Sequence, residues 1–182
     1  MNRKCLDALM AEHKTILRAA DVLDAMATKA TNDLEYDYED VRAILQILRV
    51  FGDECHQAKE EGALFPVFAS VAGNSQYAAV RHMLFEHERD RSLIDGMESA
   101  IQRSNAAQFI EYARRLASIL RNHIYKEDNI LFETMNAVLS AQDDERILAD
   151  FETFDRDFDR NHKDALIRQL RLLEWKYLRK AA

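Results

Sequence analysis

The chain has 182 residues, of which 48% are hydrophobic and 31% are charged, and it carries a formal net charge of −7 at pH 7. This length is sufficient for one domain with a substantial core, whereas the acidic balance predicts no nucleic-acid partner, because phosphate contacts need a basic face. No apolar run approaches the roughly 20 residues of a transmembrane segment, and Glu12 interrupts the N-terminal residues too early for a secretory segment, so we expect a cytoplasmic protein.

Apolar residues recur at helical spacing along most of the chain. The first predicted helix holds an apolar stripe over residues 6–23, with His13 inside it, and is expected to end at a polar break over residues 31–33. A second helix is predicted from about Asp37, and Pro66 is expected to mark its last turns or a kink.

The third and fourth predicted helices are also separated by short polar turns. After a turn at residues 73–75, the third helix is expected from about Gln76 to Ile101, and the pair Ser104-Asn105 starts the fourth. Beyond Ala141 the sequence predicts one further long helix, or two, with three aromatic residues at helical spacing: Phe151, Phe154 and Phe158.

Four helices joined by short connections predict an all-α fold, an antiparallel up-down-up-down four-helix bundle over residues 1–140. Residues 141–182 are expected to form a C-terminal helical extension. Because its aromatic residues are too apolar to be exposed, we expect the extension to pack on the bundle or on a partner subunit, so a homodimer through this segment is one option.

Two stretches, residues 56–65 and 123–132, repeat the pattern H-x3-E-[ED]-x2-L-F. A histidine and a carboxylate four residues apart lie on the same face of a helix, so each copy can bring both groups to one ion. Upstream of each copy lies a Glu-His pair whose histidine falls on an apolar stripe. The candidate metal ligands are therefore His13, His56, Glu60, His87, His123 and Glu127.

These residue types indicate the kind of metal. Burying ionised glutamates in an apolar core is costly unless they are paired or bound to a cation. Imidazole and carboxylate ligands without thiolates favour iron or another mid-series transition metal. Four histidines and two glutamates suffice for two ions if each glutamate bridges, which leaves open positions for a small molecule. Neither the Glu-x-x-His pattern of ferritin-like bundles nor the H-E-x-x-H pattern of zinc proteases occurs in the sequence.

Over roughly residues 5–140, these motifs resemble the hemerythrin-like (HHE) cation-binding domain family. The resemblance implies a four-helix bundle around a non-haem di-iron centre with an oxo or hydroxo bridge, in which the four motif histidines are ligands and Glu60 and Glu127 are bridging carboxylates. Met83 stands where oxygen-carrying hemerythrins have a fifth histidine. A glutamate four residues after the fourth histidine is similar to the branch that includes iron–sulfur repair proteins and an iron-sensing F-box domain.

The motifs leave two functional classes open. The chain is expected either to bind or sense a small molecule (O2 or NO) or iron status, or to act as a di-iron enzyme. The enzyme would disproportionate peroxide, reduce NO, or donate iron for cluster repair. Both classes need a diatomic or peroxide ligand at the same centre. A metal-free helical scaffold would leave the repeated motif unexplained.

Other polar residues have less specific interpretations. Glu61 and Asp128 could each replace the preceding glutamate as a bridge. Asp90, one turn after the third histidine, is expected to be a hydrogen-bond acceptor near the site or a solvated residue. His162 is expected to have a structural hydrogen-bonding role, and Cys55 to pack as a small hydrophobic residue.

Overall fold

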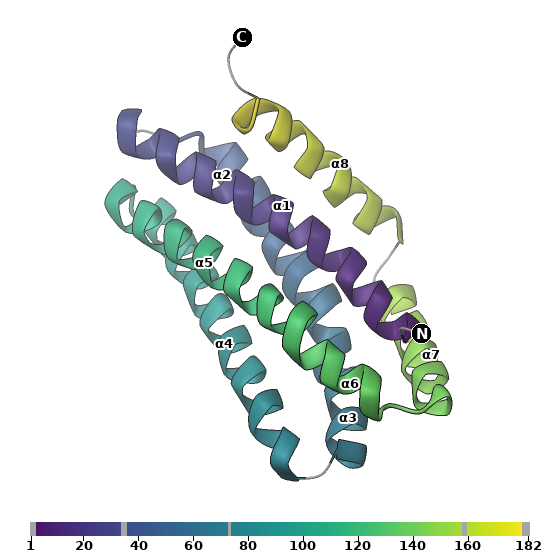
Figure 1. Cartoon of the computed structure of the whole chain (residues 1–182). Coiled ribbons are helices and arrows are strands. Elements are labelled where there is room, and N and C mark those ends of the chain that lie inside the picture. Colours follow the sequence, from purple (N-terminus) through teal and green to yellow (C-terminus); the bar gives the residue numbers. More distant parts are fainter. Residues whose placement is uncertain (1–2, 34–35, 73, 158–159, 180–182) are drawn as a thin grey trace.

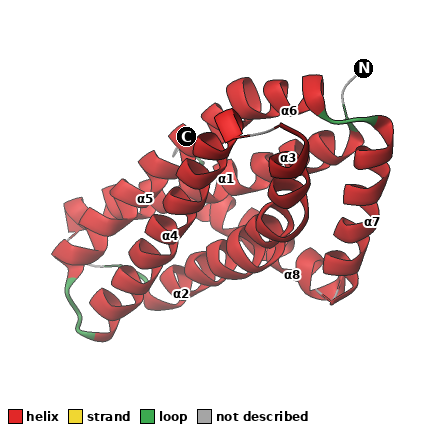
Figure 2. Cartoon of the chain, turned by 90° about the horizontal axis from the view of Figure 1, so that it is seen from below, coloured by secondary structure: helices red, strands yellow, loops and turns green. Residues whose placement is uncertain are grey.

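A computed structural model describes residues 3–33, 36–72, 74–157 and 160–179 (Figure 1). Within these ranges the chain is helical apart from short loops (Figure 2), so the predicted all-α class is confirmed. None of the described helices is long and apolar enough to cross a membrane. In chain order the elements are α1 (Lys4–Asp33), α2 (Tyr38–Gln46), η1 (Ile47–Gln57), η2 (Glu60–Leu64), α3 (Phe65–Ala72), α4 (Asn74–Gln102), α5 (Ala106–Lys126), η3 (Glu127–Leu131), α6 (Phe132–Val138), α7 (Ala141–Asp157) and α8 (Arg160–Tyr177).

Several of these elements join into longer helices. From α2 through η1 and η2 to α3 the chain forms one helix over residues 38–72, and α5, η3 and α6 form another over residues 106–138. The η elements are π-helical segments, in which the backbone hydrogen bonds span five residues instead of four. The predicted second and fourth helices therefore exist, and both are interrupted by π-helix.

Helix boundaries differ from the prediction at two points. The break expected over residues 31–33 is wrong, because α1 continues to Asp33 and the Thr31 hydroxyl donates to the Ala27 carbonyl within the helix. At the next turn α4 begins at Asn74, two residues earlier than expected, and Gly73 lies outside the described residues. The segment after Ala141 forms two helices, and Phe158 lies outside the described residues.

Side-chain contacts define how neighbouring helices run. Between α1 and α5, Thr31 accepts a hydrogen bond from Arg114, and Asp21 pairs with Arg121 at 2.9 Å. As the residue number falls along α1 it rises along α5, so the two helices run in opposite directions. Contacts between α4 and the helix over residues 38–72 have the same order: Arg49 with Asp95 and Asp53 with Arg91.

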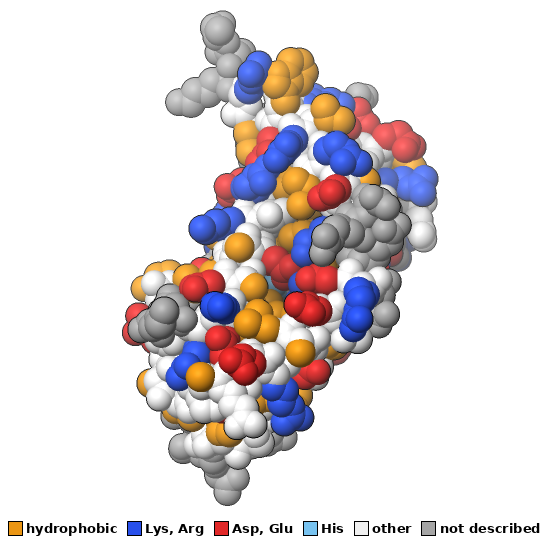
Figure 3. Space-filling view, turned by 90° about the vertical axis from the view of Figure 1, so that its right-hand side faces the viewer, with side chains coloured by type: hydrophobic (Ala, Val, Ile, Leu, Met, Phe, Trp, Pro, Cys, Tyr) orange, Lys and Arg blue, Asp and Glu red, His pale blue; other side chains and the backbone are white. Residues whose placement is uncertain are grey.

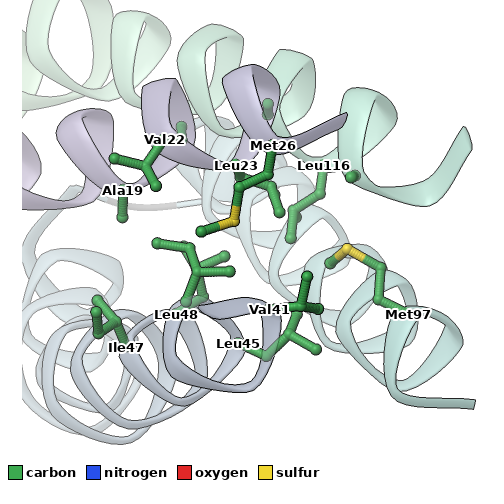
Figure 4. Packing of buried hydrophobic residues seen from close by; sticks show 14 of the residues in the cluster. Ala19, Val22, Leu23, Met26, Val41, Leu45, Ile47, Leu48, Met97 and Leu116 are labelled. Carbon is green, nitrogen blue, oxygen red and sulfur yellow. The ribbon is translucent and has the colours of Figure 1, made fainter. Parts of the chain in front are cut away.

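The hydrophobic core consists of two clusters with a polar layer between them. One cluster combines residues of α1, α2, η1, α4, α5 and α8, several of which are shown in Figure 4. The other combines the first turns of α1 with residues of η2, α3, α4, η3, α6 and α7. On α1, Ile16 belongs to the first cluster and Leu9 to the second, and buried His13 lies between these two residues. Buried His87 interrupts α4 in the same way, so the polar layer crosses the middle of the helices.

The two C-terminal helices pack on the preceding ones. Figure 1 shows α8 alongside α1, and α8 also contacts α2 and η1, whereas α7 packs against α1 and η2. Ser140 caps α7, because its hydroxyl accepts from the Asp143 amide while the Asp143 carboxylate accepts from the Ser140 amide. On the side nearest α7, acidic, basic and apolar side chains are interspersed (Figure 3).

Small and large side chains fit together where α7 meets η2. Phe151 is buried, and the ring of Phe154 lies directly over Gly62. A Cβ atom at Gly62 would lie 2.5 Å from Cζ of Phe154, so any larger residue there would displace the ring. The absence of a side chain at Gly62 therefore allows α7 to approach the helix that carries the second half of the first motif.

A matched pair of leucines on α8 tests this packing. Leu170 is fully buried against the first cluster, whereas Leu172 is 71% exposed. Leu170→Ala should lower the free energy of unfolding by about 2–5 kcal/mol through lost burial and a residual cavity. Leu172→Ala should change it by less than about 0.5 kcal/mol. Urea denaturation of both variants measures the difference, and equal effects would mean that α8 does not pack as described.

Candidate metal centre

The structure brings all six predicted ligand residues together in the polar layer. They form two groups that share Glu60 and Glu127: His13 and His56 complete the first group, and His87 and His123 complete the second. In each group the candidate ligand atoms all lie within 4.8 Å of one another. Every one of these side chains is buried. The arrangement offers two adjacent positions for a cation, with both carboxylates common to the two positions.

The distances between the candidate ligand atoms suit metal coordination. Metal–ligand bonds of about 2.1 Å place neighbouring ligand atoms roughly 3 to 3.5 Å apart. The observed nitrogen–oxygen distances are 3.3 Å for His13 Nε2 to Glu127 Oε2, 3.5 Å for His56 Nε2 to Glu60 Oε1, 3.4 Å for His87 Nε2 to Glu60 Oε2 and 3.2 Å for His123 Nε2 to Glu127 Oε2. The helices therefore hold these atoms at coordinating separations.

Unpartnered atoms at the centre of the site show that these residues fit a metal. Both carboxylate oxygens of Glu60 and of Glu127, and Nε2 of His13, are buried and have no hydrogen-bond partner among the described residues. Burying a charged carboxylate without a partner costs several kcal/mol. A cation bound between these atoms would satisfy them all at once. The donor atoms therefore have the composition of a metal site, and a bound cation would offset the cost of burying them.

Each of the four histidines donates from Nδ1 to a carboxylate behind it. The pairs are His13 with Asp128 at 2.6 Å, His56 with Glu12 at 3.1 Å, His87 with Glu61 at 2.7 Å and His123 with Glu86 at 2.9 Å. A proton held at Nδ1 leaves Nε2 free to bind a metal and fixes the orientation of the ring. All four imidazoles are thus set in the tautomer that a metal ligand needs.

These acceptor carboxylates follow the sequence repeat. Glu12 and Glu86 immediately precede a candidate histidine, and Glu61 and Asp128 immediately follow a candidate glutamate. In the structure Glu61 and Asp128 contact the Nδ1 atoms and belong to neither ligand group, so the expectation that they could replace the bridges finds no support in this geometry. The sequence repeat includes these acidic residues, but the packing of the helices determines with which histidine each one forms a hydrogen bond.

The last two positions of the repeated motif also contact the site. Phe132 stacks on the ring of His13 with a centroid distance of 5.6 Å, and Phe65 stacks on His87 at 6.0 Å. Each phenylalanine thus covers the histidine of a Glu-His pair on another helix. Leu64 and Leu131, one residue earlier, are buried in the second hydrophobic cluster. The L-F pair at the end of each copy therefore anchors the motif and shields an imidazole from water.

A π-helical turn occurs at the same place in both copies. The amide of Phe65 donates to the carbonyl of Glu60, and the amide of Phe132 donates to that of Glu127, so both bonds span five residues. Such turns widen the helix locally and are frequent at functional sites. Here they lie where consecutive carboxylates, Glu60 with Glu61 and Glu127 with Asp128, reach different histidines. Nothing in the sequence predicted them.

Charges within the site stabilise one another. Burial lowers the pKa of His87, but the carboxylates of Glu60 and Glu61 outweigh it and raise the pKa to about 9. Burial likewise opposes the charged form of His123, whose pKa is nevertheless raised to about 10, chiefly by Glu127. Burial and the neighbouring Glu127 would raise the pKa of Glu60, yet the surrounding histidines bring it to about 2. The neighbouring carboxylates therefore favour the imidazolium form of His87 and His123, and the histidines favour the carboxylate form of Glu60.

Behind His56, the network extends to the C-terminal helices. Glu12 accepts hydrogen bonds from Lys59 at 2.8 Å and from Lys163 of α8 at 2.6 Å, and Lys59 also pairs with Asp155 of α7. Glu12, Cys55 and Asp155 form a third group with potential ligand atoms. The two lysines already neutralise its carboxylates, so this group has no need of a cation. Cys55 itself is buried, as its predicted packing role requires.

A small cavity adjoins the site. It has a volume of about 20 Å³, and its lining includes His56 of the first group, His123 of the second and Asp90. Asp90 is 3% exposed, and neither of its oxygens has a hydrogen-bond partner among the described residues. The expectation that Asp90 accepts a hydrogen bond or is solvated finds no support among the described residues. His162, for which a structural hydrogen-bonding role was expected, is an exposed residue of α8.

The fold and the site together define a class: a helical protein with a buried histidine–glutamate cation site. The model of the hemerythrin HHE cation-binding domain matches residues 5–135, and the chain belongs to that family. The resemblance inferred from the repeated motif is thereby confirmed. Comparisons with curated proteins and with solved structures find no match.

The raised histidine pKa values predict how the metal-free protein responds to pH. A pKa raised in the folded state adds stability below the unfolded value of about 6.5, and this stability is lost as pH rises through the folded value. For His87 and His123 the loss falls between about pH 6.5 and 10. Denaturation of chelator-treated protein should therefore show roughly 1–3 kcal/mol less stability at pH 9 than at pH 6.

The exposed residue Leu172, which carries no titratable group, provides the control for this experiment. Leu172→Ala should leave the pH dependence unchanged, whereas His87→Gln should reduce it. Stability of the metal-free protein that stays constant or rises between pH 6 and 9 would contradict the charge balance inferred for the site.

Proposed function

We propose that this protein binds two iron ions in a non-haem di-iron centre and uses that centre to bind or sense a small molecule such as O2 or NO, or to sense iron status. One observation carries the proposal: Glu60 and Glu127 belong to both ligand groups, and all four of their oxygens are buried with no hydrogen-bond partner in the part of the chain that the structure describes. Two cations bridged by these carboxylates would satisfy every one of those atoms. Imidazole and carboxylate donors without thiolates suit iron among the available metals.

The proposed ligands are His13, His56, His87 and His123 at Nε2, with Glu60 and Glu127 as bridges. An oxo- or hydroxo-bridged pair of irons would supply the redox chemistry. The chain's own contribution is to orient the imidazoles through Nδ1 and to exclude water with Phe65 and Phe132. The adjoining cavity, lined by histidines of both groups, gives a small molecule a place beside the centre.

The helix arrangement supports a matching domain assignment. We propose that residues 1–140 form an antiparallel up-down-up-down four-helix bundle with the di-iron site at its centre, and that residues 141–182 are a helical extension of it. The opposite directions of α1 and α5 and the position of the ligands on four helices support this classification. Metal ligands then come from the bundle alone, and the extension contributes through Glu12.

An enzyme is the second candidate, because one feature of the site suits proton-coupled chemistry. Peroxide disproportionation and NO reduction both require protons, and Asp90 places a buried carboxyl group at the cavity. Iron donation for cluster repair would instead require the ions to leave. The same ligands serve each of these functions, so kinetics must separate them.

Metal content of paired variants tests the bridging role. Glu60→Ala should lose more than one ion per chain, because this carboxylate belongs to both groups. Glu61→Gln, one residue away, should keep both ions but bind them roughly 10–100-fold more weakly, through poorer orientation of His87. Elemental analysis and melting temperatures with and without iron measure both effects, since metal binding stabilises the folded state.

Wild-type protein should take up two irons per chain and melt at a higher temperature when loaded. A single ion in the wild-type protein, or two ions retained in Glu60→Ala, would refute the bridged di-iron site.

Exposure of the iron-loaded protein to candidate ligands distinguishes binder from enzyme. The protein is loaded with ferrous iron without oxygen, then mixed separately with O2, NO and H2O2 while its absorption spectrum is recorded. A stable, reversible spectral change is expected for a binding or sensing protein. Repeated consumption of NO or H2O2 with return of the starting spectrum would replace that conclusion with the enzymatic one.

A further inference from the structure

We infer that Asp90 is a positioning residue that donates a hydrogen bond to the small molecule occupying the cavity beside the metal centre. This inference rests on the proposed function and adds to it the protein group that recognises the ligand. The ligand class is a diatomic or similarly small molecule with an electron-rich atom that accepts a hydrogen bond.

The location of Asp90 is the first argument. It projects from α4 one turn beyond His87 and lines the same cavity as His56 and His123, which belong to different ligand groups. A molecule in this cavity is therefore adjacent to residues of both proposed metal positions. Elsewhere the wall consists of Gly52, apolar residues such as Ile16 and Leu116, and three polar ones: Gln57, Asp53 and Arg91. Asp53 and Arg91 are paired with each other at 2.8 Å, so Asp90 and Gln57 are the groups there that lack a partner among the described residues.

The lack of a partner is the second argument. Among the described residues, each of the four carboxylates behind the histidines accepts a hydrogen bond, and the proposed bridges have a cation to bind. Asp90 is buried and, within the described ranges, has neither kind of partner. Burying an unpartnered polar group costs roughly 1–3 kcal/mol. A purely structural Asp90 would lower the stability of the fold with no contact to offset the cost, whereas a ligand in the cavity supplies the missing partner.

The burial of Asp90 fits a donor. A carboxyl group removed from water without a hydrogen-bond partner among the described residues disfavours its charged form. A protonated carboxyl donates through its O–H. The cavity volume of about 20 Å³ admits one water-sized or diatomic molecule. Gln57 also lines the cavity. Its Oε1 is buried without a partner among the described residues, so it is an acceptor for any ligand that carries a hydrogen.

Two variants of the same shape test the inference. Leucine has the branched skeleton of aspartate without its polar atoms, and asparagine retains a donor. Azide is the probe, because its terminal nitrogen accepts a hydrogen bond, and its dissociation constant is measured optically on the oxidised, iron-loaded protein. Asp90→Leu should bind azide roughly tenfold more weakly than wild type, the loss expected for one hydrogen bond. Asp90→Asn should remain within about threefold of wild type.

A second readout needs no metal. Because Asp90→Leu removes an unpartnered buried carboxyl, its metal-free form should melt at a higher temperature than metal-free wild type. Asp95→Asn, on the same helix with a side chain 68% exposed, is the control and should change neither measurement. A lower melting temperature for Asp90→Leu would show that Asp90 is a structural residue and would overturn the inference.

The outcomes separate this inference from the proposed function. If wild type and Asp90→Leu hold two irons and bind azide equally tightly, the inference is wrong and the di-iron function stands. If wild type holds no iron pair, or holds it and binds none of azide, O2 and NO, the proposed function and the inference fall together.

Discussion

The burial of two glutamate carboxylates in the middle of the helices determines much of the surrounding structure. Glu60 and Glu127 lie in the polar layer with no hydrogen-bond partner for any of their oxygens among the described residues. Basic and acidic groups alternate around them: four imidazoles, then the carboxylates of residues 12, 61, 86 and 128, then basic side chains at the rim such as Arg91 and Lys126. Each layer offsets the desolvation cost of the one inside it.

The alternation is nearly two-fold symmetric, because it is built from two halves. Each half consists of a helix with a Glu-His pair, α1 or α4, and the following helix, which carries one copy of the repeated motif. In each half the glutamate of the pair accepts a hydrogen bond from the histidine of the motif. The acidic residue after each candidate glutamate instead accepts a hydrogen bond from the Glu-His histidine of the other half, as Glu61 accepts from His87. Neither half is complete without the other, so the site assembles only when all four helices have packed.

Symmetry ends at the C-terminal helices. Lys163 of α8 donates to Glu12, and Asp155 of α7 pairs with Lys59, which contacts the same carboxylate. At the corresponding position of the other half, Glu86 is neutralised by Lys126 of α5. Through these contacts the extension supports the half that contains His56.

The sequence by itself determined the helical class, the six candidate ligands and their pairing within each helix, because these depend on local periodicity and on the four-residue spacing of one helix face. Tertiary structure decided what depends on contacts between helices. It placed Glu61 and Asp128 behind histidines, stacked Phe65 and Phe132 on imidazoles, and left Asp90 buried beside a cavity. The π-helical turns that separate adjacent carboxylates also escaped prediction, since no residue type specifies them. Spacing along one helix fixes which side chains share a face, but only packing fixes what that face meets.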